Sequence, residues 1–169
     1  MTIDIRPARL PQDLARVRGL FQAYADSLGI SLEFQAFEAE LAALPGDYAL
    51  PRGRLLLAWR EGQAIGCVAL RPLQDGICEM KRLYISPAAR GSGLGRLLAG
   101  RICQEARDAG YSRMRLDTLA SMIAARRVYA GLGFRPIPPY CYNPFADAVF
   151  LELDLTSEPQ APAVATACS

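Results

Sequence analysis

The sequence predicts one α/β domain whose mixed sheet joins an antiparallel meander to a parallel β-α-β unit. Apolar and β-branched residues gather in three runs that are separated by short glycine-containing turns, at residues 54–59, 64–70 and 77–86. Apolar residues then recur at helical spacing over residues 94–106, and another strand pattern follows at residues 114–118. A strand, a crossover helix and a strand in that order place the two strands parallel to each other.

The residues before the meander predict a short strand and two helices. Residues 3–6 alternate apolar and polar side chains, as a half-buried strand does. Apolar side chains recur at helical spacing over residues 14–28, and Gly29 is a natural end for this helix. A second apolar stripe predicts a helix over residues 34–44, which ends before Pro45. We expect both stripes to pack into the core rather than to line a ligand groove.

The chain after the β-α-β unit predicts one more helix and one more strand. Residues 122–132 fit a helix that ends at Gly133, and residues 148–155 fit a final strand. The following segment is rich in Pro, Ala, Ser and Thr and has almost no large apolar side chain. We therefore expect a domain over residues 1–155 and a disordered tail over residues 156–169.

The composition excludes several classes of protein. The 169 residues are 51% hydrophobic, 21% charged and 8% aromatic, which is typical of a folded domain and not of a disordered or fibrous chain. Nineteen basic and seventeen acidic residues give a formal net charge of +2, so we expect no nucleic-acid partner. No apolar run reaches the roughly 18 residues that a membrane span requires. Five cysteines occur without a C-x-x-C pair, and we expect a cytoplasmic protein with no membrane partner.

Histidine is absent from the sequence, and its absence limits the chemistry. It excludes Ser-His and Cys-His nucleophilic pairs, His-ligated zinc and imidazole bases. Acids and bases must then be Asp, Glu, Tyr, Lys, Cys or water, and we expect no metal site. Cys78 has no histidine to activate it, so we expect the cysteines to be structural.

A glycine-rich turn, Arg-Gly-Ser-Gly-Leu-Gly-Arg, occupies residues 90–96 between a strand pattern and a helix. Glycines let the backbone approach a ligand closely, and the free N–H groups at the start of a helix attract an anion such as a pyrophosphate. The spacing does not fit the Rossmann fingerprint, because Arg96 stands in the last glycine position, and no Gly-Lys precedes Ser or Thr as in a Walker loop. By itself the pattern is equally compatible with a flexible turn.

The order and spacing of several motifs resemble the GNAT superfamily of acyl-CoA N-acyltransferases. The motifs are Glu-Met-Lys-Arg-Leu-Tyr-Ile-Ser-Pro at 79–87, the glycine-rich turn, Leu-Asp-Thr at 116–118, and Ala-Arg-Arg-Val-Tyr with Leu-Gly-Phe within 125–134. The resemblance spans residues 3–155, and its specific part lies in residues 79–134. It implies a fold in which two neighbouring parallel strands splay apart and the pantetheine arm of acetyl-CoA inserts between them.

The resemblance also implies which residues bind acetyl-CoA. Backbone groups of the splayed strand would pair with the pantetheine amides, and the glycine-rich turn would hold the pyrophosphate. Many relatives carry asparagine at the position of Met122, which packs against pantetheine but makes no amide hydrogen bond, so Thr118 or Ser121 could substitute. The implied cofactor-binding residues are Leu83, Tyr84, Ile85, Arg90, Gly91, Ser92, Gly93, Leu94, Gly95, Arg96, Thr118, Met122 and Ala125.

Two residues are catalytic candidates under the same resemblance. Glu79 falls where many family members carry a general base, which takes the proton of an amine, directly or through water. Tyr129 falls where the family places a tyrosine near the cofactor sulfur, and its phenol would protonate or hydrogen-bond the leaving thiolate. A structural alternative for Glu79 is a cross-strand pair with Arg82 or Lys81. The alternative for Tyr129 is an ordinary core side chain.

The resemblance implies an N-acetyltransferase that moves an acetyl group from acetyl-CoA to a primary amine of a small molecule or peptide by direct attack. Two alternatives stay open: a CoA-binding regulatory module without turnover, and an interaction domain whose glycine-rich turn binds nothing. Lys81, Arg82 and Tyr140 are expected to border the acceptor site, where they would suit a carboxylate, although solvated cations and core aromatics explain them equally well. A homodimer is a further expectation.

Overall fold

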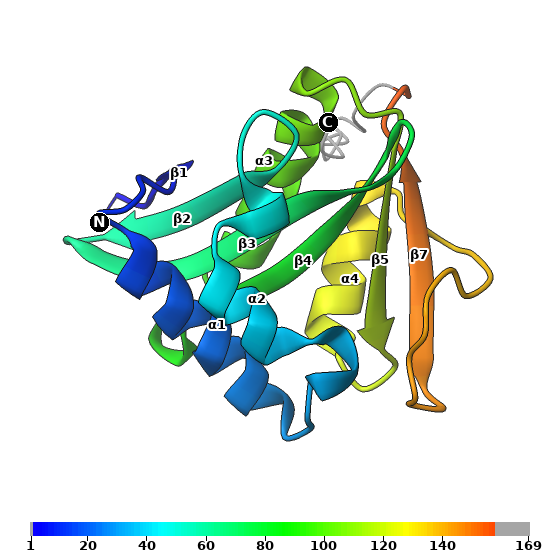
Figure 1. Ribbon diagram of the computed structural model, residues 1–169, viewed down its shortest axis with the longest axis horizontal. Helices are drawn as coiled ribbons and strands as arrows, with labels where there is room; N and C mark the ends of the chain where they lie inside the picture. Colours follow the sequence, from blue (N-terminus) through cyan, green and yellow to red (C-terminus); the bar gives the residue numbers. More distant parts are fainter. Residues whose placement is uncertain (1, 158–169) are drawn as a thin grey trace, which may run out of the picture.

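The computed structural model describes residues 2–157, apart from the side chain of Phe34. Figure 1 follows the chain from its blue N-terminal strand to the orange strand at its C-terminal end. With η for 3₁₀ helices, the elements are β1 (Asp4–Pro7), α1 (Leu14–Leu28), η1 (Glu33–Gln35), α2 (Phe37–Ala43), η2 (Gly46–Tyr48), β2 (Arg54–Arg60), β3 (Gln63–Gln74), β4 (Ile77–Ile85), η3 (Pro87–Ala89), α3 (Leu94–Asp108), β5 (Arg113–Leu119), α4 (Ile123–Leu132), β6 (Arg135–Pro136) and β7 (Ala148–Asp154).

Seven strands of the described chain form one mixed sheet in the order β1-β2-β3-β4-β5-β7-β6. The strands β1 to β4 are successive antiparallel neighbours, whereas β4 and β5 are parallel and α3 connects them. The predicted α/β class, with its meander and its β-α-β unit, is therefore confirmed. β6 is not among the predicted strands, because two residues are too few to show an alternation.

Helices cover both faces of the sheet. α1 and α2 lie on one face, and α3 and α4 lie on the other (Figure 1). Each face has its own buried apolar cluster, and the neighbouring residues Leu56 and Leu57 of β2 belong to different clusters. This division follows from the alternation of side chains along a strand. Phe21 of α1 and Phe37 of α2 are buried in the same cluster, so these members of the two apolar stripes pack into the core as expected. Tyr24 and Leu28 of the first stripe line a cavity instead, so for them the expectation is wrong.

The helix predicted over residues 34–44 is interrupted. η1 ends at Gln35 and α2 begins only at Phe37, because Ala36 has a φ of 53° in the left-handed region. A residue in that conformation cannot continue a right-handed helix. The break leaves Gln35 facing β4, where its side-chain oxygen accepts hydrogen bonds from Lys81 and Arg82.

β4 and β5 separate along their length. They are paired only at three successive positions, from Ile77 opposite Arg113 to Glu79 opposite Arg115. Beyond this point β4 stays paired with β3, and β5 stays paired with β7 as far as Leu119. The second halves of β4 and β5 therefore present open edges to each other, with α4 behind the gap (Figure 1). The splayed strands implied by the resemblance are present.

The tail predicted over residues 156–169 falls mostly outside the described residues, which end at residue 157. The N–H of Thr156 donates to the Asp154 carboxylate at 2.9 Å, and the Ser157 hydroxyl donates to the Asp154 carbonyl at 2.9 Å. These first two residues of the predicted tail thus fold back on the end of β7.

Candidate active site

A β-bulge interrupts β4 beside its open edge. The register of β4 against β3 shifts by one residue, so Arg82 and Leu83 together stand opposite the single residue Val68. Arg82 has a φ of 61°, which is uncommon for a residue other than glycine. Consecutive side chains on a regular strand point to opposite faces. Because of the bulge, Lys81 and Arg82 point to the same face and both bond Gln35.

The side chain of Arg82 holds this backbone conformation in place. Its guanidinium donates two hydrogen bonds to the carboxylate of Glu40, at 3.0 and 3.1 Å, and one to Gln35 at 2.9 Å. It also lies over the rings of Phe37 and Tyr24, at 5.0 and 5.6 Å from their centroids. A strained backbone costs about 1–3 kcal/mol and persists where the surroundings over-determine it. The contacts of Arg82 meet that condition, so the bulge is a fixed part of the site.

The bulge decides which backbone groups of β4 face the gap. The N–H of Ser86 donates to the carbonyl of Ile65 in β3. Backbone groups alternate sides along a strand, so those of Tyr84 also face β3. Leu83 and Ile85 consequently direct their backbone groups toward the open edge. Of the three residues expected to pair with pantetheine, Leu83 and Ile85 have the required direction and Tyr84 does not.

A cleft of about 600 Å³, which we call the α3 cleft, extends from this open edge to the start of α3. Gly91 and Gly93 have φ values of 80° and 82° in the turn before the helix, where a side chain would be strained. Gly95 lies inside α3, and a Cβ placed on it would be 3.9 Å from the nearest atoms, which belong to Ile85 and Val128. The first N–H groups of a helix have no helical partner, so they are free to bind an anion.

Two arginines give the α3 cleft positive charge. Arg90 and Arg96 both line it. Arg90 Nε donates to the carbonyl of Ile85 at 3.1 Å, so one lone pair of that carbonyl is already engaged. Ser92 does not line the cleft, because its hydroxyl donates to the carbonyl of Ala89 and stabilises the turn. The cleft thus combines free helix N–H groups with two cations, which is the chemistry that phosphate groups require.

The start of α4 forms the opposite wall of the α3 cleft. Ser121, Met122 and Ala125 line it there. Thr118, at the end of β5, instead donates its hydroxyl to the sulfur of Met122 at 3.5 Å and lines a second cavity. Of the two residues expected to replace the asparagine, Ser121 therefore lines the α3 cleft, while Thr118 orients Met122.

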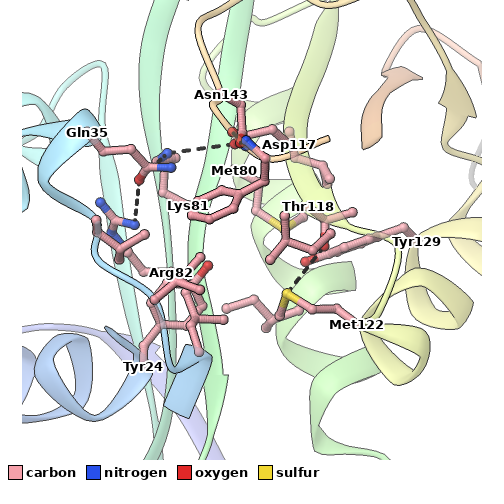
Figure 2. A pocket seen from close by; sticks show the side chains of 17 residues that line it. Tyr24, Gln35, Met80, Lys81, Arg82, Asp117, Thr118, Met122, Tyr129 and Asn143 are labelled. Atoms are coloured by element: carbon pink, nitrogen blue, oxygen red, sulfur yellow. Dashed lines mark hydrogen bonds and ion pairs between the residues drawn. The ribbon is translucent and has the colours of Figure 1, made fainter. Parts of the chain in front are cut away.

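The second cavity, which we call the inner cavity, measures about 40 Å³ and lies between the splayed ends of β4 and β5 (Figure 2). Tyr24, Leu83 and Met122 line both the inner cavity and the α3 cleft, so the two spaces adjoin at these residues. A ligand in the α3 cleft would reach the inner cavity past the backbone of Leu83. This junction is where two bound molecules could react.

Tyr129 of α4 lines the inner cavity. Its side chain is buried against Phe134, with ring centroids 5.7 Å apart, and its hydroxyl makes no hydrogen bond to another described residue. Burial raises the pKa of Tyr129 above its ordinary value, so the phenol stays protonated at neutral pH. A protonated hydroxyl with no partner beside the junction suits the predicted role of general acid.

A chain of polar side chains crosses the inner cavity from η1 to β5 and beyond (Figure 2). Lys81 Nζ donates to Gln35 Oε1 at 3.1 Å and lies 3.9 Å from Asp117 Oδ1. Asn143 Nδ2 donates to Asp117 Oδ2 at 3.1 Å. Burial lowers the pKa of Lys81, and the carboxylates of Glu79 and Asp117 act in the opposite direction. The cavity therefore holds a buried cation and a buried anion that are close but not hydrogen-bonded.

Glu79 lies outside both cavities. One of its carboxylate oxygens accepts from Arg71 at 3.0 Å, and the other accepts from the Tyr140 hydroxyl at 2.6 Å. Its ionic partner is thus Arg71 of β3, not Arg82 or Lys81. Tyr140, expected at the acceptor site, contacts Glu79 instead of lining the inner cavity. Among the described residues, the carboxylate that does line the inner cavity is that of Asp117.

Sequence reasoning missed four residues of the inner cavity: Tyr24, Gln35, Asp117 and Asn143. Tyr24 stands in the apolar stripe of α1 and reads as a core residue. A charge inside the apolar strand pattern Leu-Asp-Thr was a signal that could have found Asp117. Gln35 is the last residue of η1, and Asn143 lies in the loop between β6 and β7. No local sequence pattern marks either of them as a site residue.

Three further features of residues 2–157 concern metal ligands, helix length and cysteines. No His, Cys, Asp or Glu side chains there gather in a group that could hold a metal ion, and no helix there has the length and apolar character to cross a bilayer. The cysteines of that range are free, and three of them are buried. Burial raises the pKa of Cys78 to about 12, which makes its thiol a poor nucleophile.

Known proteins resemble this chain in sequence and in fold. The model of the acetyltransferase (GNAT) family matches residues 18–134. An uncharacterised N-acetyltransferase from Schizosaccharomyces pombe is 42% identical over 156 residues, which cover 91% of this chain and 96% of that protein. A GNAT-family acetyltransferase from Staphylococcus aureus Mu50 has a TM-score of 0.75 at 18% identity, with 91% of this chain and 99% of that one covered. An acetyltransferase from Salmonella typhimurium, solved with its cofactor acetyl-CoA, has a TM-score of 0.66 at 20% identity, with 97% and 100% covered.

Proposed function

Because the chain belongs to the GNAT family of acetyltransferases, we propose that it transfers the acetyl group of acetyl-CoA to a primary amine of a small molecule or peptide. The observation that carries the proposal is the junction of the α3 cleft with the inner cavity, at the point where β4 and β5 part. The acetyl-CoA bound to the Salmonella typhimurium neighbour supports the choice of donor.

The α3 cleft fits acetyl-CoA in two ways. The free N–H groups at the start of α3, together with Arg90 and Arg96, would hold the pyrophosphate. The backbone groups of Leu83 and Ile85 would pair with the pantetheine amides and complete the open edge of β4. When bound, acetyl-CoA supplies the acetyl group as a thioester, which an amine can attack directly.

The residues around the junction would handle charge and protons. The N–H of Leu83, turned outward by the bulge, would stabilise negative charge that develops on the acyl oxygen. Tyr129 would donate a proton to the departing sulfur. Glu79 is the proton acceptor that the resemblance implies. The geometry adds Asp117 as a second candidate, because its carboxylate lines the inner cavity while that of Glu79 does not.

Two measurements test the proposed function. Acetyl-CoA at 100 times its dissociation constant should raise the free energy of unfolding by about 2.7 kcal/mol, which a thermal melt detects. A thiol assay with a panel of amines should then show release of CoA. The absence of a melting shift with either acetyl-CoA or CoA would overturn the proposal. A shift without release from any amine would instead indicate a CoA-binding regulatory module.

A further inference from the structure

Lys81 is a buried cation with an incomplete set of partners among the described residues. Its ammonium group has three N–H donors. One of them bonds Gln35 Oε1 at 3.1 Å, an oxygen that also accepts from Arg82 at 2.9 Å. The closest carboxylate oxygen, on Asp117, is 3.9 Å away and thus too far for a hydrogen bond. The other buried cation of the described chain, Arg82, has a carboxylate at 3.0 Å.

The unused donors of Lys81 belong to the inner cavity. The side chain of Lys81 is 6% exposed and lines that cavity, with Asp117 across from it (Figure 2). A buried charge without a close partner is costly, and a ligand of opposite charge removes that cost. Burial also lowers the pKa of Lys81, as is expected for an ammonium group with too few acceptors. The position therefore favours a ligand that brings a carboxylate.

Asp117 offers the complementary charge. One of its oxygens accepts from Asn143 at 3.1 Å, while the other is the one that lies 3.9 Å from Lys81. The side chain of Asp117 is 7% exposed, so it too is largely removed from water. A ligand that carries an ammonium and a carboxylate close together would give each of these two buried groups a partner.

We propose that the acceptor is a free α-amino acid, with its carboxylate on Lys81 and its α-ammonium on Asp117. This inference rests on the proposed function and specifies its acceptor. The two charges of an α-amino acid sit on adjacent carbons, so they fit side by side against two groups 3.9 Å apart. The inner cavity, at about 40 Å³, holds about three water-sized groups, which is room for such a head group but not for a peptide chain.

The chemistry balances with the residues present. Asp117 takes one proton from the ammonium, and the freed lone pair forms a bond to the acyl carbon. The carbon–sulfur bond breaks, and a second ammonium proton reaches the sulfur by way of Tyr129. The third proton stays on the amide nitrogen of the N-acetyl amino acid. Lys81 takes no part in these transfers, so it is a specificity residue.

The test compares amino acids with their carboxamides, which keep the α-amine and lose the carboxylate. Pairs with small, acidic and aromatic side chains are used, and kcat/KM is measured by thiol release. We expect wild type to prefer the acids, and Lys81→Met to lower kcat/KM for acids about 10- to 100-fold while amides change less than about twofold. The amines of an acid and its amide differ in pKa, which by itself changes their reactivity. The decisive quantity is therefore how the ratio of kcat/KM for the acid to kcat/KM for the amide changes between wild type and variant.

Matched variants guard against a merely structural effect. Lys81→Arg keeps the charge and should keep the preference for acids. Arg127 lies on the exposed face of α4 and lines neither cavity. Arg127→Met should therefore leave kcat/KM unchanged for both acids and amides. Binding gives a readout without acetyl-CoA: millimolar amino acid should raise the melting temperature of wild type more than its amide does, and this difference should vanish in Lys81→Met.

The outcomes separate this inference from the proposed function. Equal use of acids and amides by wild type, or an equal loss for both in Lys81→Met, would overturn the assignment of Lys81 while leaving an acetyltransferase. If acetyl-CoA does not bind and no amine releases CoA, it is the proposed function that fails. If Lys81→Met does not fold, three results still test the assignment of Lys81. They are the ratio of kcat/KM for acids and amides in wild type, the melting shifts of wild type, and the preference of Lys81→Arg.

Discussion

The α3 cleft and the inner cavity adjoin at Leu83, yet they are built from different parts of the chain. The α3 cleft is lined mainly by two continuous stretches, residues 83–96 and 121–128. The inner cavity is lined by residues that range from 24 to 145, and charged side chains supply much of its chemistry. Under the proposed function, recognition of the donor would thus be a local property of the chain, whereas recognition of the acceptor would depend on tertiary packing. Variants in the two regions should separate the two functions.

The largest effect should come from Asp117→Asn, which removes the carboxylate of the inner cavity. We expect kcat/KM to fall about 100- to 10,000-fold near neutral pH, because the amine loses its proton acceptor. The melting shift with acetyl-CoA should stay the same, since the α3 cleft is untouched. Part of the lost rate should return at high pH, where the amine deprotonates unaided. Thiol release between pH 7 and 10 measures this recovery.

Glu79→Gln is the matched control for the other carboxylate. It weakens the part-buried ion pair with Arg71 and the hydrogen bond from Tyr140, so we expect a lower melting temperature. A recovery of activity at high pH in Glu79→Gln, and not in Asp117→Asn, would give the role of proton acceptor to Glu79.

Tyr129→Phe should have the next largest effect. The change removes one hydroxyl and keeps the ring against Phe134, so the fold and the affinity for acetyl-CoA should not change. Turnover should fall about 10- to 1000-fold, because the leaving sulfur loses its proton donor. Steady-state kinetics with varied acetyl-CoA separate kcat from KM. Turnover equal to that of wild type would make Tyr129 a core residue only.

Gly95→Val acts on the α3 cleft alone. The new side chain enters the cleft from the first turn of α3, and we expect the dissociation constant of acetyl-CoA to rise about 10- to 100-fold as contacts to charged phosphates are lost. Gly100→Val in the same helix is the control, because a Cβ there meets nothing within 4 Å and Gly100 does not line the α3 cleft. Calorimetric titration of both variants gives the comparison, and an equal loss in the two would point to helix distortion.

A smaller effect should appear in the pH dependence of acceptor choice. A lysine with a lowered pKa is charged below that pKa and loses its charge as pH rises through it. The preference for acids over amides should therefore weaken at a lower pH than for an ordinary lysine. In Lys81→Arg the preference should persist over the same range. The charged and titratable groups around Lys81 are Glu79, Asp117, Arg71, Arg82 and Cys141.

The order of helices and strands can be predicted from the sequence because each element has its own periodic spacing of apolar residues. α3 follows from its apolar spacing, and Gly133 ends α4 with a φ of 100°, as its residue type suggests. The break at Ala36 is not readable. Alanine is the strongest helix former, and nothing in the neighbouring residues marks its left-handed conformation.

The same division holds for the candidate site. Gly95 and Tyr129 stand in spaced motifs, so their places on α3 and α4 can be predicted. Lys81 is conspicuous as the single lysine of the chain, but its surroundings are not. Whether it faces water or a cavity depends on the bulge at Arg82 and on Asp117 of another strand. A one-residue shift in pairing leaves no signature in the sequence of a single strand.

The bulge at Arg82 is a change of phase within β4. Before the bulge, the odd-numbered residues Glu79 and Lys81 point to the face covered by α1 and α2. After the bulge, the even-numbered Tyr84 packs on that face, and Leu83 packs on the face covered by α3. One strand thereby shows ionisable side chains along its first half and a bare backbone edge along its second. Deletion of a single residue here would bring the halves into phase and exchange the faces of everything downstream. The site therefore constrains the number of residues in β4 as strictly as it constrains their chemistry.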